Sequence, residues 1–185
     1  MQTPWGHADS QKTLAPGIIS VSTPSHGGIK VEKELNQLIP DYMRTSDGWY
    51  EEDVDWSIVA TVFPHAFTTE ERKHAKNTLR GYIPMAYEMY YKEVIPPGES
   101  HAKDAMAFRV LHKNDYVGMA AFGDWHPQVP KGHVVVFAGR GGRTVDYRYP
   151  KDTAYFVVPQ DDYDVPSPHG FVIDEKKYPR IDFKE

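Results

Sequence analysis

Carboxylates gather in one short stretch of the sequence, Asp47–Trp56, which also contains two tryptophans. Paired carboxylates can hold Mg²⁺ or Mn²⁺ for phosphoryl chemistry, because hard cations prefer oxygen ligands. The stretch lacks the Asp-x-Asp-x-Asp-Gly spacing of a calcium-binding loop. It offers Glu51, Glu52 and Asp53 as candidate metal ligands. The alternative is a solvated helix start, where acidic side chains interact favourably with the helix dipole.

A histidine stands in a glycine-rich turn, Ser25–Gly28. His26 is a candidate general base, and the backbone amides of such a turn can bind an anion. Ser25 does not form a useful dyad with its neighbour, since adjacent residues rarely have the required side-chain geometry. The alternative interpretation is a hairpin turn that carries an incidental histidine.

A second histidine and carboxylate group follows in the segment Gly123–His133. Asp124, His126 and His133 are residue types that bind transition metals, and Asp124 and His126 are also candidates for acid–base catalysis. The chain has nine histidines, so chance proximity is easy. A surface or structural role is the alternative for this segment.

Two arginines lie on the glycine-rich segment Gly139–Arg143. Arg140 and Arg143, with the backbone of Gly141, are candidates for binding a phosphate or another anion. The segment lacks the Gly-Lys-Ser/Thr ending of a P-loop, and its spacing does not fit a dinucleotide-binding fingerprint. A plain hairpin turn is the alternative.

The first half of the sequence predicts a hairpin followed by helices. A β-branched run, a glycine-rich turn and an alternating segment are typical of two paired strands. The segment Thr68–Glu71 has the pattern of a capping box, which predicts a helix start. The expected elements are strands Ile18–Thr23 and Ile29–Val31, a short helix within Glu32–Leu38, a helix from Glu51 through Phe63, and helices Thr68–Leu79 and Pro84–Val94. A buried strand is the alternative for the run Trp56–Phe63, because periodicity does not separate the two in so short a segment.

The second half predicts mainly strands. The expected strands are Ala105–Leu111, Tyr116–Phe122, Val134–Phe137, Val145–Tyr149 and Ala154–Val158. Together the halves predict an α+β fold, with an antiparallel sheet mainly from the C-terminal half packed by helices mainly from the N-terminal half. Residues 1–16 are expected to form a flexible arm, and residues 17–185 a single globular domain.

Composition excludes several classes of protein. The chain has no cysteine, which rules out disulfides, thiolate catalysis and iron–sulfur clusters. The net charge of −5 argues against non-specific nucleic-acid binding, which needs a basic face. No apolar run reaches the roughly 18 residues of a membrane span, and the N-terminus lacks a signal-peptide pattern. We therefore expect a cytoplasmic protein without a cofactor, a divalent metal being the one exception considered.

Several motifs in order resemble a known bacterial family. They are Thr23–Gly28, Gly48–Asp53, Pro97–Ser100, Gly123–Pro127, Gly139–Arg143 and Gly170–Asp174. Over residues 17–175 the chain resembles a domain family of unknown function found in phages, plasmids and integrated mobile elements. There the domain occurs alone or within large polyvalent proteins that protect incoming DNA from host defences. The resemblance implies a biological context and carries over no catalytic residue.

Three functional hypotheses follow. The first is a phage or mobile-element protein that counters a host defence system by binding and inhibiting a host protein. It is favoured by the resemblance and by the lack of a catalytic motif, which speaks against an enzyme. The second is a metal-dependent hydrolase or nuclease acting on phosphoesters. It requires the candidate ligands and a histidine to converge on one cleft. The third is a sponge for a signalling nucleotide, which requires a pocket lined by Arg140 or Arg143.

Overall fold

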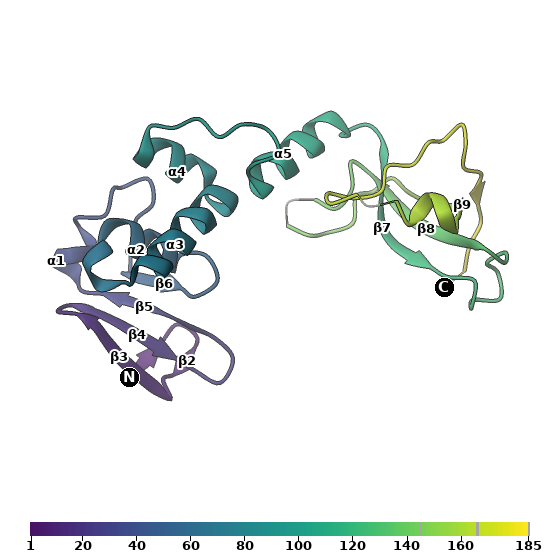
Figure 1. Cartoon of the computed structure of the whole chain (residues 1–185). Helices are drawn as coiled ribbons and strands as arrows, with labels where there is room; N and C mark the ends of the chain where they lie inside the picture. Colours follow the sequence, from purple (N-terminus) through teal and green to yellow (C-terminus); the bar gives the residue numbers. More distant parts are fainter. Residues whose placement is uncertain (145, 166, 185) are drawn as a thin grey trace. The chain divides into compact units, whose positions relative to one another are not determined.

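The computed structural model describes residues 1–144, 146–165 and 167–184, and the chain divides into two compact units (Figure 1). The N-terminal unit is Met1–Lys103 and the C-terminal unit is Asp104–Glu185. Both units contain antiparallel sheets and helices, so the predicted mixture of α and β structure is confirmed. The division differs from the predicted single domain at residues 17–185.

The N-terminal unit is a four-stranded antiparallel sheet with helices on it. Its elements are β1 (Gln2–Thr3), β2 (Gly6–His7), β3 (Ser10–Ala15), β4 (Ile18–Ser22), β5 (Gly27–Val31), α1 (Lys33–Asn36), β6 (Trp49–Glu51), α2 (Trp56–Val62), the 3-10 turn η1 (Pro64–Ala66), α3 (Thr69–Tyr82) and α4 (Pro84–Tyr91). The strand order is β3-β4-β5-β6. Helix α2 packs against β5 and β6, and α3 packs against α2.

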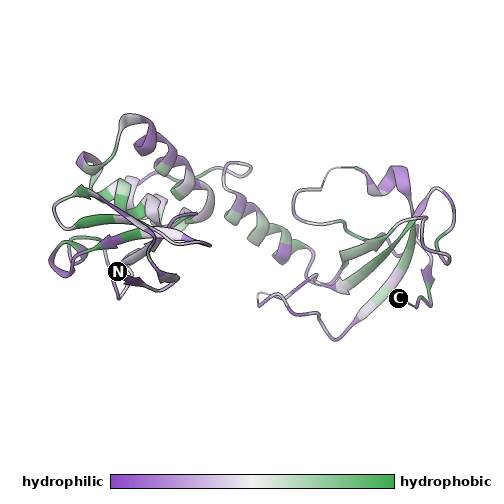
Figure 2. Ribbon diagram, turned by 90° about the horizontal axis from the view of Figure 1, so that it is seen from below, coloured by the Kyte–Doolittle hydropathy of each residue, from purple (hydrophilic) through white to green (hydrophobic). Residues whose placement is uncertain are grey.

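The core of this unit lies between the sheet and α2. Ile18, Val31, Tyr50, Val59 and Leu79 are all fully buried. Burying each such side chain contributes about 1.5–3 kcal/mol to the free energy of unfolding. Figure 2 shows hydrophobic residues along the strands of both units. These buried side chains therefore hold β4, β5 and β6 against helices α2 and α3.

A buried polar network joins β6 to the segment before it. The Tyr50 hydroxyl donates to Asn36 Oδ1 at 2.6 Å and accepts from the Thr45 backbone N–H at 3.2 Å. Asn36 Nδ2 in turn donates to the Thr45 carbonyl at 2.9 Å. Burial raises the pKa of Tyr50, so this hydroxyl stays protonated. The network holds the start of β6 in register with β5.

The predicted capping box at Thr68 is present and begins α3. The Glu71 backbone N–H donates to the Thr68 hydroxyl at 3.2 Å, and Glu71 Oε2 accepts from the Thr68 backbone N–H at 2.7 Å. We expect Thr68→Ala to lower the free energy of unfolding of the N-terminal unit by about 1 kcal/mol at pH 7, because α3 loses its N-cap. Urea denaturation followed by circular dichroism measures this difference.

The capping box also has a pH signature. The backbone N–H and the hydroxyl of Thr68 lower the pKa of Glu71 below its ordinary value of 4.5. Because the folded-state pKa is depressed, this stabilisation is complete above pH 4.5 and is lost as the pH falls through the folded-state value. The stability difference between wild type and Glu71→Gln should therefore change between pH 6 and pH 3. A constant difference across that range would contradict the assignment.

Residues 1–16, which were predicted as a flexible arm, contain paired strands. Within them, β1 pairs with β2, and β3 pairs with β4 from Ser10↔Ser22 to Ala15↔Ile18. The first four residues of β3 are exposed, because β3 is an edge strand of the sheet. An exposed edge strand needs no apolar alternation, so the polar sequence Ser-Gln-Lys-Thr gave no strand signal.

The C-terminal unit is built on a second antiparallel sheet. Its elements are β7 (Tyr116–Phe122), β8 (His133–Arg140), β9 (Thr153–Pro159), α6 (Gln160–Tyr163) and β10 (Arg180–Ile181). The order is β10-β9-β8-β7. Each face of β8 carries a hydrophobic cluster, with Val134, Val136 and Ala138 on one and Val135 on the other. The strands predicted at Val134–Phe137 and Ala154–Val158 lie in β8 and β9.

The predicted placement of helices and strands needs correction, because each unit has its own sheet. The expected strand Ala105–Leu111 lies in helix α5 (His101–Leu111), which begins in the N-terminal unit and ends in the C-terminal unit. The Ser100 hydroxyl accepts from the Lys103 backbone N–H at 3.4 Å at the start of this helix. Residues 146–149 form no strand, and Val145 lies outside the described residues. Among described helices, none has the length and apolarity needed to cross a bilayer.

Candidate metal site

The turn between β4 and β5 fixes the backbone of His26 and leaves its imidazole exposed. The buried Thr23 hydroxyl donates to the His26 carbonyl at 2.7 Å and accepts from the His26 N–H at 3.1 Å. The Thr23 N–H also donates to the same carbonyl at 2.7 Å. These three bonds close a four-residue turn, so the position of His26 is set by its backbone.

Glu51 and Glu52 reach this turn because β6 pairs with β5. In that pairing Gly28 lies opposite Glu51, and the Glu52 N–H donates to the Gly27 carbonyl at 3.2 Å. One ligand atom each from His26, Glu51 and Glu52 lies within 4.8 Å of the other two. The structure thus brings together a histidine and two neighbouring glutamates that follow it by 25 and 26 residues in the sequence.

Gly27 gives the Glu52 carboxylate room to lie against the backbone. A Cβ atom at Gly27 would lie 2.3 Å from Glu52 Oε2 and 2.9 Å from the Val21 carbonyl oxygen. Both distances are too short for any side chain without movement. The close approach explains why glycine occupies this position.

One oxygen of Glu51 has no partner in the described part of the chain. Glu51 Oε2 accepts from the backbone N–H groups of Asp53 at 2.7 Å and Val54 at 3.4 Å, which holds the entry to α2. Glu51 Oε1 is buried and makes no hydrogen bond to a described residue. A buried unsatisfied carboxylate oxygen is costly unless something outside the protein pairs with it.

Negative charge is concentrated next to this group. Burial, and then the charge of Glu51, raise the pKa of Asp55 above its ordinary value. A desolvated carboxyl close to another carboxylate resists ionisation. The local field therefore favours a cation and disfavours an anion.

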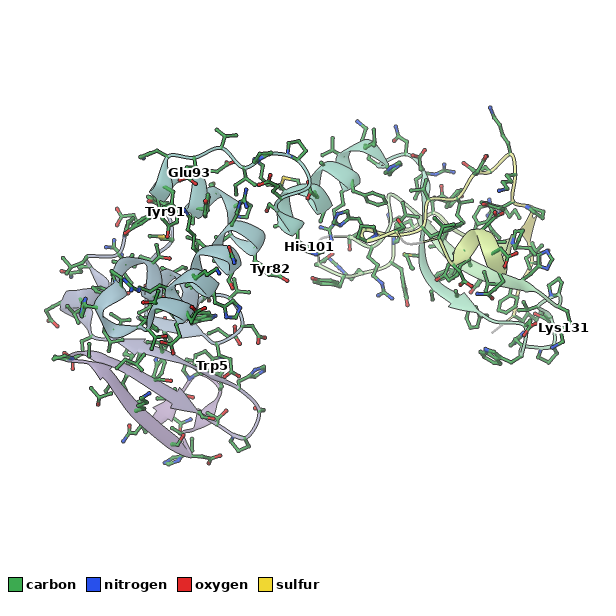
Figure 3. The ribbon with its side chains drawn as sticks, viewed as in Figure 1. Trp5, Tyr82, Tyr91, Glu93, His101 and Lys131 are labelled. Carbon is green, nitrogen blue, oxygen red and sulfur yellow. The ribbon has the colours of Figure 1, made fainter. Side chains whose placement is uncertain are left out.

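A pocket of about 290 Å³ adjoins Glu52 on the sheet. Leu14, Ile29, Trp56 and Phe67 provide apolar walls, and Lys12 and Glu71 provide charged groups. The Trp5 ring packs where a Cβ atom of Gly28 would lie and meets Trp49 edge-on at 5.7 Å. Figure 3 labels Trp5, which comes from the segment between β1 and β2.

The predicted candidates of this region separate into two groups. His26, Glu51 and Glu52 come together, whereas the sequence predicted His26 as a separate acid or base. Asp53 is exposed and does not join them; its contribution is the backbone N–H that Glu51 accepts. Lys12 and Gly27 were missed. Gly27 had a signal in the Gly-Gly pair, whereas Lys12 had none, because β3 itself was not predicted.

The connection between β7 and β8 carries Asp124 and His126 of the predicted group, and His133 begins β8. Asp124 Oδ2 accepts from the Gly132 N–H at 3.2 Å and lies 3.7 Å from Nζ of Lys131, labelled in Figure 3. His126 packs on Phe183 at 4.7 Å, and His133 Nδ1 lies 2.9 Å from the Lys131 carbonyl. Within residues 1–144, 146–165 and 167–184, these three do not form a three-ligand group.

Arg140 is engaged by the fold of the C-terminal unit. Its guanidinium lies over the Tyr116 ring at 3.9 Å, with Nε donating to Asp152 at 3.0 Å and Nη1 lying 3.3 Å from Glu175. The hydrogen bond to Asp152 raises the pKa of Arg140. The pKa of Asp152 is lowered by hydrogen bonds, first from the Tyr116 hydroxyl and then from Arg140. These partners neutralise the Arg140 guanidinium, so it is not available to bind an anionic ligand.

Gly141 and Arg143 differ from Arg140 in what they contact. The Gly141 N–H donates to the Asp115 carbonyl at 2.8 Å, so this amide is not available to an anion. Arg143 lies over the Tyr149 ring at 4.7 Å and borders a separate pocket. The structure therefore does not form one anion site from the three residues predicted together.

Comparison with known proteins gives one match. A family model described as a domain of unknown function (DUF7007) matches residues 1–113. No curated protein and no solved structure matches the chain. The matched region contains the whole N-terminal unit and with it His26, Glu51 and Glu52.

Proposed function

We propose that this chain, which belongs to the DUF7007 family of domains of unknown function, binds a divalent metal ion and hydrolyses a phosphoester with it. The observation that carries the proposal is the convergence of His26, Glu51 and Glu52 within 4.8 Å, beside a pocket. A cation held there would also give the buried Glu51 Oε1 its missing partner. The proposal reverses the preference for a non-enzyme that the sequence alone gave.

The ligand types favour a transition metal. One imidazole with two carboxylates suits Mn²⁺, Zn²⁺ or Fe²⁺ better than Mg²⁺ or Ca²⁺, which bind mainly oxygen. Three protein ligands leave coordination positions open, as catalytic sites require and structural sites do not. When bound, such a metal supplies a Lewis acid for a phosphoryl oxygen and lowers the pKa of water.

The pocket supplies the groups that would receive the substrate. Lys12 lines it and offers a cation for a non-bridging phosphate oxygen. Trp56 and Phe67 offer apolar faces for the organic part of the ester. Glu52 belongs to both the pocket and the metal group, so the metal group borders the pocket that Lys12 lines.

Metal-dependent stability and turnover test the proposal. We expect Mn²⁺ or Zn²⁺ to raise the melting temperature relative to chelator, since a metal at about 100 times its dissociation constant adds roughly 2.7 kcal/mol. The same metal should support hydrolysis of bis(p-nitrophenyl) phosphate, and chelator should stop it. A melting temperature that no divalent metal changes would remove the metal site. Stabilisation by metal without turnover of any phosphoester would support metal binding and contradict the hydrolase activity.

The hypothesis of a phage or mobile-element protein that inhibits a host defence protein stays a prediction. Its structural support is the exposure of Met85 and Met89, one turn apart on α4. Direct binding of a purified defence protein to a chain with its metal site disabled would support it. Failure to bind across the defence proteins of several hosts would count against it.

A further inference from the structure

A second pocket lies in the C-terminal unit, about 210 Å³ in volume. It is bordered by the end of α5, by β7 and by the turn after β8. Phe108, Arg109, Arg143, Tyr147 and His169 are among its lining residues, and none of the described residues that line it is an aspartate or a glutamate. Its charge is therefore positive, in contrast to the acidic site of the N-terminal unit.

Two arginines of this pocket lack an acidic partner. The guanidinium of Arg109 makes no ion pair or hydrogen bond to a residue that the structure describes. Among the residues that the structure describes, Arg143 donates to two neutral oxygens, the Tyr147 carbonyl at 3.4 Å and the Tyr149 hydroxyl at 3.3 Å. By contrast, Arg140 pairs with Asp152 and Glu175, and Arg148 pairs with Asp146. Two arginines without an acidic partner among the described residues thus border the same pocket.

Aromatic rings border the same space. Phe108 packs on His112 at 4.6 Å and on His169 at 5.9 Å, which fixes the orientation of its ring. Tyr147 has a φ of 60°, a left-handed conformation that residues other than glycine rarely adopt. A hydrogen bond from its N–H to the Thr144 carbonyl at 2.9 Å holds this conformation. The turn thereby places an exposed tyrosine at the edge of the pocket.

We propose that this pocket binds a phosphorylated ring compound of the nucleoside monophosphate class. The phosphate would lie between Arg109 and Arg143, because guanidinium groups bind phosphate oxygens in a bidentate manner. The ring would lie against Phe108 and Tyr147, since aromatic side chains stack on any base. The volume is below the roughly 300 Å³ at which small-molecule pockets usually begin, so it fits a mononucleotide better than a dinucleotide.

Calorimetric titration of the full chain tests this inference. The four ribonucleoside 5′-monophosphates, adenosine and inorganic phosphate are titrated separately, with chelator present so that no metal in the N-terminal unit can bind phosphate. We expect at least one monophosphate to bind, and adenosine and phosphate to bind at least about tenfold more weakly. Absence of binding by all four monophosphates at millimolar concentration would overturn the proposal. Equal binding of inorganic phosphate would also overturn it, because the rings would then contribute nothing.

Substitutions locate the binding. Arg109→Gln and Arg143→Gln should each weaken the binding of the monophosphate by about tenfold or more, because each variant loses a charged hydrogen bond to the phosphate. Arg148→Gln is the matched control, since it removes the same charge from the same turn outside the pocket lining. Equal weakening by Arg148→Gln would show a general charge effect and overturn the site. All three arginines are exposed, so the variants should keep the fold, which circular dichroism checks.

Discussion

Glu52→Gln removes the metal-dependent rise in melting temperature, and Asp53→Asn, one residue further along, leaves it in place. Glu52 contributes a ligand atom to the group with His26 and Glu51, whereas Asp53 does not. The two substitutions remove the same charge from adjacent exposed positions. A difference between them therefore reports coordination and not the general field of the acidic segment.

The expected effect is large. Loss of roughly 2.7 kcal/mol of ligand stabilisation corresponds to on the order of 10 °C in a unit of about 100 residues. Loss of a direct ligand should also weaken metal binding by more than the roughly 10- to 100-fold that follows removal of a hydrogen-bond partner of a ligand. Differential scanning calorimetry with Mn²⁺ and with chelator measures the first effect, and titration of metal measures the second. Equal shifts in the two variants would contradict coordination by Glu52.

His26→Ala provides a second ligand test that does not disturb the fold. Its imidazole is exposed, and its structural bonds are made by the backbone, which the substitution keeps. Glu51→Gln is less informative, because the Glu51 carboxylate also accepts from the N–H groups of Asp53 and Val54 at the entry to α2. We therefore expect His26→Ala to behave like Glu52→Gln and to leave the melting temperature in chelator unchanged.

Local chemistry explains which elements could be predicted from the sequence. The hairpin of β4 and β5 and the capped start of α3 depend on residues within a few positions, so their signals are contained in the segment itself. Helix α5 was predicted as a strand because residues 105–111 are apolar apart from Arg109 and show no clear helical period. The side chains that decide it are outside that run: Ser100 at its start, and Lys103, which pairs with Glu88 at 2.7 Å.

The candidate site could be predicted only in part for a different reason. Each of its motifs carries a visible signal, a histidine in a glycine turn and a pair of glutamates. Their proximity depends on β5 pairing with β6, a strand of only three residues that follows a long connection. A strand this short has no usable alternation. The sequence therefore identified Glu51 and Glu52 as candidate ligands and His26 as a candidate acid or base, and only the fold shows that they meet.

Gly28→Ala should strongly destabilise the N-terminal unit. A Cβ atom there would lie 2.5 Å from the Tyr50 carbonyl oxygen in the backbone of β6 and 2.2 Å from Cη2 of Trp5. Overpacking of this kind costs about 1–3 kcal/mol, and a clash with a paired strand cannot be relieved by a side-chain rotation. We expect the melting temperature in chelator to fall by on the order of 10 °C. Adding Trp5→Ala removes only the ring clash, so full recovery in that double variant would contradict the role given to the Tyr50 carbonyl.

Gly27→Ala, the neighbouring substitution, should act on the site more than on the fold. Its Cβ atom meets the end of a flexible side chain, the Glu52 carboxylate at 2.3 Å, and the Val21 carbonyl at 2.9 Å. Glu52 can rotate away, which relieves the closer contact but moves the carboxylate from His26 and Glu51. The melting temperature in chelator should therefore fall less than in Gly28→Ala, while the rise with Mn²⁺ disappears. If Gly27→Ala keeps that rise, the carboxylate does not need its place against the turn, and Glu52 is not a ligand in the geometry described.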